Sequence, residues 1–283
     1  MLCIPPRFYF PVKLQKGIVL KHMKKVKLIL GIDLEGINED LLSSGINLSV
    51  DRVIEIGAVL WDIDYNAPVE ILSEIIDESD RLPISEEVEE LTGLSGPLIK
   101  KWGKSGQDIK KVLLLLTAMI EKADCLMSHN ARGYDCPMLT EMFRRFQLPF
   151  PDRTWIDSVT DIEYPKRFIH KGLMNLEHYH GFINPFPHRA FSDVLSMLKI
   201  ASHYSWDRMK LLADSPRITI VAKCPTPNWK NKMEVDRFMK VKNKISRAKF
   251  KWDPSDKIWS KEVHKILIDE NKLNFEFEWY ILE

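Results

Sequence analysis

Short apolar runs in the first two thirds of the chain alternate with segments whose apolar residues recur every three or four positions. We expect strands at 26–34, 52–62, 69–77, 124–128 and 153–158, of which 26–34, 52–62 and 124–128 carry few polar side chains, as a buried strand does. The helical spacing predicts helices near 85–91, 106–122, 137–147, 173–181 and 189–203. Three successive strands, followed by alternation of helices and strands, predict an α/β domain whose mixed sheet is flanked by helices.

The first of these strands ends in two acidic residues, Asp33 and Glu35. Because side chains alternate along a strand, both carboxylates face the same way, about 6 to 7 Å apart. At that separation they repel each other and raise each other's pKa unless a cation lies between them. The pair therefore indicates a metal site, although an Asp-x-Glu sequence on its own is also typical of a solvated strand end.

A second polar group stands between the strand at 124–128 and the helix near 137–147. It contains His129, Asn130, Tyr134 and Asp135, and Pro137 follows at a position that suits the first turn of a helix. We therefore expect Asp135 at the N-terminus of that helix, where the helix dipole favours a carboxylate. Taken alone, it could equally be a helix cap.

A third group, His188 and Asp193, stands at the start of the helix near 189–203. Five residues at about 100° each would place the two side chains roughly 140° apart on one helix. We therefore expect His188 in the approach to the helix and Asp193 within it. A single histidine before a helix is also typical of an ordinary surface residue.

These three groups, taken in order along the chain, resemble the three exonuclease motifs of the DEDDh family, whose last motif is His188-Arg-Ala-Phe-Ser-Asp193 here. The family includes the proofreading exonuclease subunits of bacterial DNA polymerase, RNase T, oligoribonuclease and exonuclease X. The resemblance covers roughly residues 26–205 and implies a ribonuclease H-like fold and a 3′–5′ exonuclease. Arg189 stands where the related tyrosine class carries Tyr, which favours the histidine class.

The resemblance also assigns a set of metal ligands and a general base. Oxygen ligands suit two Mg²⁺ or Mn²⁺ ions rather than zinc, and the base takes a proton from the attacking water. The resemblance gives Glu35 a catalytic role as well, together with the general base. The assigned residues are Asp33, Glu35, Asp135 and Asp193 for the metal ions and His188 for the base.

The chain departs from the usual family pattern beside these motifs. Gly36 stands where many members carry Thr, Tyr134 replaces the common Phe, and the stretch 37–50 is longer than usual. The resemblance implies that Gly36 and Ile37 line the pocket for the terminal nucleotide, so these departures leave the substrate preference open. The other candidate substrate-binding residues are His129, Asn130 and Tyr134, of which His129 and Asn130 could instead close the loop through backbone hydrogen bonds.

The character of the chain changes after about residue 210. We expect an N-terminal extension at 1–25, an exonuclease domain at 26–210, a linker with two prolines at 211–228, and a small basic α+β module at 229–283. Asp253-Pro254 predicts a turn between two strands of this module. Ten Lys and two Arg face five acids between Lys230 and Lys265, a net charge of +7, interleaved with aromatic residues. They could hold phosphates and stack bases, or form the solvated face and core of a small domain.

Composition excludes several other classes of protein. The formal net charge of +1 excludes a globally basic nucleic-acid binder, and the longest apolar run, 112–120, is too short to span a bilayer. The four cysteines show no metal-binding spacing, which favours reduced thiols in the cytoplasm. Prolines and basic residues interrupt the stretch 1–25, so we expect no signal peptide there, and Met23 would be a natural start of the chain.

Together these features predict a metal-dependent 3′–5′ exonuclease that acts on single-stranded ends, with DNA favoured, and releases 5′-mononucleotides. An RNA 3′-end trimming enzyme similar to RNase T or oligoribonuclease is the alternative, because discrimination depends on how a pocket treats the 2′ hydroxyl. From a different class, a catalytically silent nucleic-acid-binding module is the rival. The intact carboxylates and histidine argue against that rival.

Overall fold

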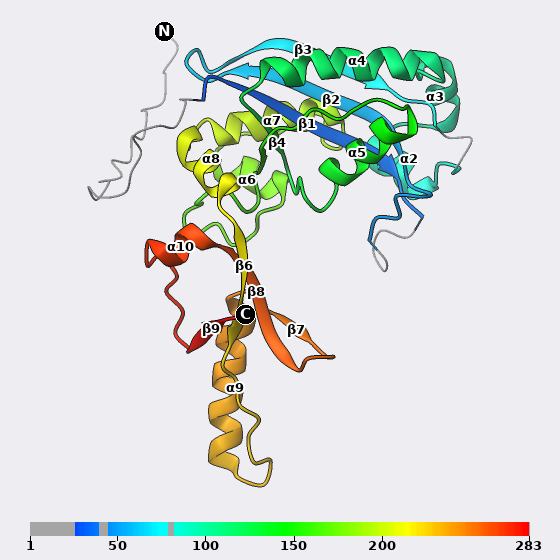
Figure 1. The fold of residues 1–283 in the computed structure, drawn as a ribbon. Helices are drawn as coiled ribbons and strands as arrows, with labels where there is room; N and C mark the ends of the chain where they lie inside the picture. Colours follow the sequence, from blue (N-terminus) through cyan, green and yellow to red (C-terminus); the bar gives the residue numbers. More distant parts are fainter. Residues whose placement is uncertain (1–25, 40–44, 79–81, 283) are drawn as a thin grey trace.

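The computed structural model describes residues 26–39, 45–78 and 82–282, so the expected extension at 1–25 lies outside the described residues. Within them the chain forms two sheets, one of five strands and one of four (Figure 1). The order of the first sheet is β3-β2-β1-β4-β5. Its first three strands are antiparallel, whereas β4 and β5 run parallel to β1. The predicted mixed sheet is therefore confirmed.

The elements of this first unit follow the predicted order closely. The strands are β1 (Leu28–Ile37), β2 (Arg52–Asp62), β3 (Ala67–Ile75), β4 (Cys125–Ser128) and β5 (Trp155–Asp157). The helices are α2 (Glu86–Thr92), α3 (Gly96–Trp102), α4 (Gln107–Lys122), α5 (Asp135–Arg145), α6 (Leu173–Tyr179), α7 (Ala190–Ala201) and α8 (Trp206–Asp214). Only α3 and α8 have no counterpart in the prediction.

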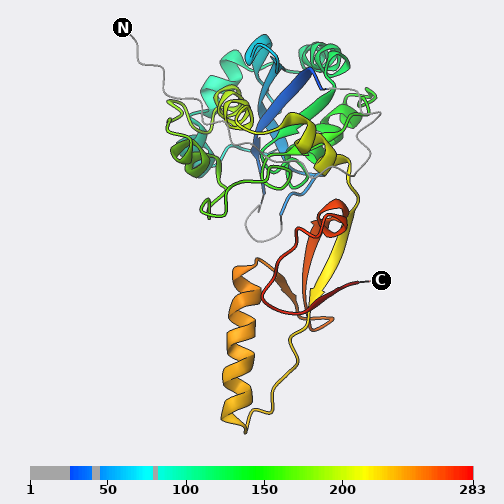
Figure 2. The ribbon, with the colours of Figure 1, turned by 90° about the vertical axis from the view of Figure 1, so that its left-hand side faces the viewer.

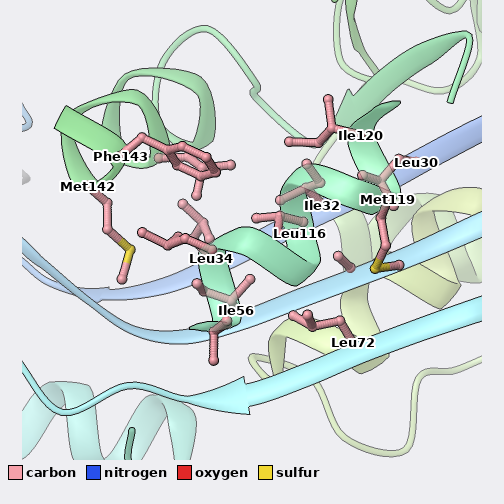
Figure 3. Packing of buried hydrophobic residues seen from close by; sticks show 14 of the residues in the cluster. Leu30, Ile32, Leu34, Ile56, Leu72, Leu116, Met119, Ile120, Met142 and Phe143 are labelled. Atoms are coloured by element: carbon pink, nitrogen blue, oxygen red, sulfur yellow. The ribbon is translucent and has the colours of Figure 1, made fainter. Parts of the chain in front are cut away.

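The two faces of the sheet are covered by different helices. Leu30, Ile32 and Leu34 of β1 pack with residues of α4 and α5 in the largest buried cluster (Figure 3). The alternate positions of β1 face α7, where Gly31 leaves room for Val194 and Leu198: a Cβ at position 31 would lie 2.8 Å from an atom of each. Since Asp33 and Glu35 continue this second series, the alternation of the strand turns both carboxylates toward α7.

A glycine in β2 brings the start of α7 down onto the sheet. Gly57 pairs with Asp33 in the register of β1 and β2. A Cβ at position 57 would overlap the backbone of Ala190 and Phe191, so only glycine permits this approach. The N-terminus of α7 therefore lies directly beside the acidic end of β1.

The second unit contains a sheet of order β7-β8-β6-β9. Its elements are β6 (Arg217–Ala222), α9 (Lys232–Arg247), β7 (Lys251–Asp253), β8 (Ile258–His264), α10 (Lys265–Asp269) and β9 (Trp279–Ile281). The predicted hairpin is confirmed, and the Asp253 carboxylate accepts the N–H groups of Ser255 and Asp256 at 2.8 and 3.2 Å.

The expected linker at 211–228 is corrected by this topology. Helix α8 runs to Asp214, and β6 is a central strand that pairs with both β8 and β9. The second unit therefore begins near residue 216, because Ile218 and Ile220 supply apolar side chains to its core. The two prolines stand after this strand, in the connection to α9.

Helix α9 had no counterpart in the prediction. Figures 1 and 2 show it projecting away from the five-stranded sheet. Only residues near its C-terminal end, Val241 and Ile245, belong to the core of the second unit. No helix in the described part of the chain combines the length and apolarity needed to cross a bilayer.

Candidate active site

The acidic end of β1 carries three carboxylates rather than two. Asp33 and Glu35 lie on the face that α7 covers, and Glu55 of β2 is directly opposite Glu35 in the antiparallel register. The pairing slips by one residue after Glu35, so that Gly36 pairs with Val53. This β-bulge ends the regular alternation immediately after the two predicted ligands.

Asp135 reaches the same place from α5. It is the first residue of the helix, as predicted, and one of its carboxylate oxygens accepts the N–H of Leu34 at 3.1 Å. The residue before it, Tyr134, occupies the N-cap and makes no capping hydrogen bond with its side chain. The carboxylate of Asp135 therefore contacts β1, 101 residues away, rather than serving as a side-chain cap at the N-cap position.

The third element supplies Asp193 and His188. Asp193 lies in the first turn of α7, and His188 lies in the approach with a φ of 59°, as the spacing predicts for residues that do not share one helix. The N–H of His188 donates to Asp193 at 3.1 Å. Ligand atoms of Glu35, His188 and Asp193 all lie within 4.8 Å of one another. The structure thus brings these predicted residues together.

Burial and repulsion between carboxylates dominate the electrostatics of the cluster. Burial, followed by repulsion from Asp135 and Glu35, raises the pKa of Asp33 well above its usual value. Burial and the neighbouring carboxylates raise the pKa of Glu35 to about 8, although Arg189 opposes this shift. Burial likewise raises the pKa of Asp135 to about 8 and that of Asp193 to about 7.

This arrangement fits a divalent cation. The donors are carboxylate oxygens, which hard ions such as Mg²⁺ and Mn²⁺ prefer. Buried like charges are unfavourable unless an opposite charge compensates them, and the raised pKa values of Glu35, Asp135 and Asp193 report that missing compensation. The cluster therefore has both the chemistry and the electrostatic need of a metal site.

Two residues that support the cluster escaped the sequence prediction. Glu55 is 1% exposed, and the guanidinium of Arg189 binds it with contacts of 2.7 to 3.2 Å. The same carboxylate accepts the N–H of Ala190 at 3.0 Å. This pair fastens the start of α7 to β2 beside His188. A charged residue inside the apolar run of β2 was the available signal.

Asn184 is a further buried residue at the site. Its side-chain amide donates to Asp193 at 2.5 Å, and its carbonyl oxygen accepts the N–H of Phe186 at 3.0 Å and the hydroxyl of Ser192. Its own N–H donates to Glu177 of α6 at 3.2 Å. Asn184 therefore holds the Asp193 carboxylate and the approach to α7 in one network. Nothing in its sequence context distinguishes it from a loop asparagine.

The predicted substrate residues His129 and Asn130 make contacts that close the loop after β4. Nδ1 of His129 lies 2.7 Å from Oγ of Ser158, and burial lowers the pKa of His129 to about 4. The backbone N–H of Asn130 donates to the Asp157 carboxylate at 3.2 Å. The backbone carbonyl of Asn130 accepts the N–H groups of Gly133 and Tyr134. Asn130 thus closes the loop through its backbone, whereas His129 does so through a contact between side chains.

Gly36 and Tyr134, the two departures from the family pattern, lie against each other. A Cβ at position 36 would overlap the hydroxyl of Tyr134, and that hydroxyl donates to Asn38 at 3.1 Å. The phenol therefore occupies the space that a side chain at position 36 would need.

Ile37, in contrast, does not present its side chain to a pocket. It is 2% exposed and packs in a small buried cluster with Ile54, Leu94 and Ile99. The expectation that it lines the nucleotide pocket is therefore corrected. The bulge after Glu35 explains the difference, because it interrupts the alternation that would place the side chain of Ile37 on the same face as Asp33 and Glu35.

The first unit is similar to a known family of exonucleases. The RNase_T family model, which describes an exonuclease, matches residues 30–201, more than half of the chain. The match includes every residue assigned above to metal binding or to the general base. No curated protein is similar enough to count as a match.

Solved structures show the same fold in the first unit. The nuclease domain of 3′hExo, a DEDDh family member bound to rAMP, aligns with a TM-score of 0.50 and 18% identity over 62% of this chain and 90% of its own. A 3′-exonuclease solved for its 3′-end specific recognition of a histone mRNA stem-loop gives the same score and identity over 64% and 82%. The chain therefore belongs to the RNase_T exonuclease family, and its first unit has the ribonuclease H-like fold of these 3′-exonucleases.

Proposed function

We propose that this protein removes 5′-mononucleotides from the 3′ ends of single-stranded nucleic acid, using two Mg²⁺ or Mn²⁺ ions held by Asp33, Glu35, Asp135 and Asp193. The observation that carries the proposal is the convergence of these carboxylates, from three separate elements, with pKa values raised by burial and mutual repulsion. Divalent cations bound there would offset the charge of the phosphodiester and make the attacking water more acidic.

His188 is the proposed general base, and Glu35 is proposed to act beside it. The ligand atom of His188 lies within 4.8 Å of those of Glu35 and Asp193. The imidazole can therefore accept a proton from a water that attacks the phosphate there. The backbone hydrogen bond from His188 to Asp193 ties the position of the base to that of a metal ligand.

The choice between DNA and RNA is the open part of the proposal. The prediction from the sequence puts DNA first although no residue decides between the two, whereas the similar solved structures carry rAMP or recognise a histone mRNA stem-loop. RNA is therefore the second candidate substrate. We propose that Tyr134 borders the terminal nucleotide beside Gly36, because its hydroxyl fills the space next to the acidic end of β1. Discrimination would then depend on contacts of this region with the 2′ hydroxyl.

The cytoplasmic location remains part of the proposal. Its support is that Cys125, Cys136 and Cys224 are free thiols, and that burial raises the pKa of each. Thiols with raised pKa values are poor nucleophiles, which is compatible with a reducing compartment.

The test is digestion of 5′-labelled single-stranded DNA, single-stranded RNA and duplex DNA with Mg²⁺, with Mn²⁺ and with excess EDTA. We expect a ladder that shortens from the 3′ end, with 5′-mononucleotides as products, and no cleavage in EDTA. Oligomers that differ only in the sugar of the last nucleotide measure the preference between DNA and RNA. Absence of cleavage of every substrate with either metal would contradict the proposal.

A further inference from the structure

The two units meet at a junction beside the turn that follows β5. Asp161 in this turn is buried and contacts Nη2 of Arg217 at 3.0 Å and Nε2 of His264 at 2.9 Å. Arg208 of α8 pairs with Glu270, the residue after α10, at 2.7 Å. These contacts fasten β6, β8 and the end of α10 to the exonuclease unit. A surface on the second unit can therefore act on the same nucleic acid strand as the active site.

The second unit carries an excess of positive charge. Fifteen Lys and Arg face nine Asp and Glu between residues 216 and 282, a net charge of +6, whereas the formal net charge of the whole chain is +1. A basic unit attached to an exonuclease attracts a polyanion such as a nucleic acid strand.

Part of this charge forms a stripe along α9. Successive residues of a helix turn by about 100°, and four basic residues of α9 are spaced so that they fall within an arc of about 80°. All four are exposed, and no acidic residue of α9 falls within that arc. Val241 and Ile245, which pack in the core of the second unit, lie on another side of the helix. The basic stripe consists of Arg237, Lys240, Lys244 and Arg247.

Most of the basic stripe is not neutralised within the protein. In the described part of the chain, three of its cations form no ion pair with a carboxylate, and the fourth, Lys244, pairs with Glu276 at 2.8 Å. Both partners of that pair are exposed, at 45% and 77%, so the pair is weak and a phosphate can replace Glu276. The stripe is therefore a surface of largely uncompensated positive charge.

A pocket of about 300 Å³ lies at the C-terminal end of the stripe. Lys244 and Arg247 line it from α9, and Phe275 and Phe277 line it from the segment before β9. The two phenylalanine rings stack on each other with centroids 5.3 Å apart. Proteins that bind single-stranded nucleic acid combine such cations, which hold the backbone, with aromatic rings on which bases stack. The other residues of the lining are Ala248, Asn274 and Glu276.

We propose that this pocket holds one nucleotide of the single-stranded substrate, with its phosphate on Lys244 and Arg247 and its base against Phe275 and Phe277. The rest of the basic stripe holds the phosphates that follow. Figures 1 and 2 show that the C-terminal end of α9 is the end nearer to the five-stranded sheet, so a strand whose 3′ end lies in the active site would meet the pocket first. This inference rests on the proposed function, since it assigns the second unit to the same substrate.

The phosphate contacts are tested by binding of a 30-nucleotide single strand to the full-length protein in EDTA, at several salt concentrations. Arg247→Met and Lys240→Met each remove one cation and keep an unbranched stem. We expect weaker binding and a salt slope smaller by about 0.7 for each, the contribution of one phosphate on a single strand. Glu276→Gln removes the competing acid and should strengthen binding. Lys232→Met is the matched control, because Lys232 is an exposed cation at the other end of α9 and lies outside the arc.

The base contact is tested with an abasic strand of the same length and charge. The wild-type protein should bind the abasic strand more weakly than the normal one. Phe277→Leu should reduce this difference and leave the salt slope unchanged, since it removes a stacking surface and no charge. Thermal unfolding identifies any variant that fails to fold.

Cleavage separates this inference from the proposed function. Arg247→Met should raise the KM for the 30-nucleotide strand without changing kcat, and should cleave a dinucleotide as the wild-type protein does, because a dinucleotide is too short to reach both sites. Wild-type affinity and slope in Arg247→Met and Lys240→Met, or an equal loss in Lys232→Met, would overturn the proposed site. Absence of cleavage of every substrate by the wild-type protein would instead overturn the exonuclease function and leave the binding result intact.

Discussion

Buried acids in the exonuclease unit behave in opposite ways at the active site and at the junction. Burial would raise the pKa of Asp161, but hydrogen bonds from His264, from the backbone of Asp157 and from Thr160 hold it below its usual value. Burial also raises the pKa of Asp33, and every neighbouring carboxylate raises that pKa further. Asp161 is already paired within the fold and therefore stabilises the structure. The acids of the active site raise one another's pKa, which indicates that they bind a cationic ligand.

The largest effect should come from removing one acid from the active site. Asp33→Asn or Asp193→Asn should lower turnover by about 10³-fold or more, because the cations lose a ligand and several kcal/mol of charge stabilisation. Folding should remain intact, since removal of a like charge relieves repulsion in the metal-free site. Cleavage assays and thermal unfolding in EDTA measure both effects. Asp152→Asn, an exposed loop acid, is the control, and wild-type cleavage by either variant would refute the metal assignment.

The base should be separable from the ligands. His188 has a positive φ, so His188→Asn keeps a residue type that tolerates this backbone better than Ala does. We expect the rate to fall by about 10²- to 10⁴-fold, with oligonucleotide and metal affinity retained, as for loss of a general base. Single-turnover cleavage and a binding titration test this, with the exposed His178→Asn as the control. Equal losses of binding and rate would mark position 188 as a substrate contact instead.

At the junction the same kind of substitution should cost stability. Asp161→Asn leaves Arg217 and His264 without their buried partner, which we expect to lower the free energy of unfolding by about 3 to 5 kcal/mol. Urea unfolding gives the value. Asp269→Asn removes an exposed partner of Lys265 and should change the free energy by less than about 1 kcal/mol. If Asp161→Asn were as harmless as Asp269→Asn, the distinction between the two regions would fail.

The stability of the metal-free protein should also depend on pH. The folded state binds protons at Glu35 and Asp135 with pKa values of about 8, whereas carboxyls of the unfolded chain titrate near 4. The stability that these protons provide is complete below the pKa of the unfolded state and is lost as pH rises toward the pKa of the folded state. Unfolding in EDTA from pH 5 to 8.5 should show this decline, and Asp33→Asn should flatten it. A stability that rises through this window would contradict the raised pKa values.

The sequence predicted those parts of the fold whose signal is local. Strands β1, β2 and β4 follow from apolar runs, and the hairpin of the second sheet follows from Asp253-Pro254. Strand β6 was missed because it stands just before two prolines, which favoured a linker at this point of the chain. Helix α9 was missed although Val235, Phe238, Val241 and Ile245 recur at helical spacing, and only the last two of these contribute to a core.

The active site divides in the same way. The four carboxylates and His188 were predictable because their spacing is carried by single elements and by the order of the motifs. Glu55 was not, since its importance comes from Arg189, which is 134 residues away in the chain. The burial of Ile37 depends on a bulge, which no sequence pattern marked. Contacts between distant segments, rather than local propensity, decide these positions.

The most direct test of the account is the proton balance of metal binding. Calorimetric titration of the metal-free protein with Mn²⁺ at pH 7.5, in two buffers of different ionisation enthalpy, measures the protons released per ion. Because Glu35 and Asp135 have pKa values of about 8, we predict saturable binding with release of protons, and weaker binding with fewer protons released for Asp193→Asn. The absence of saturable binding, or binding without proton release, would contradict a cation site built from uncompensated carboxylates.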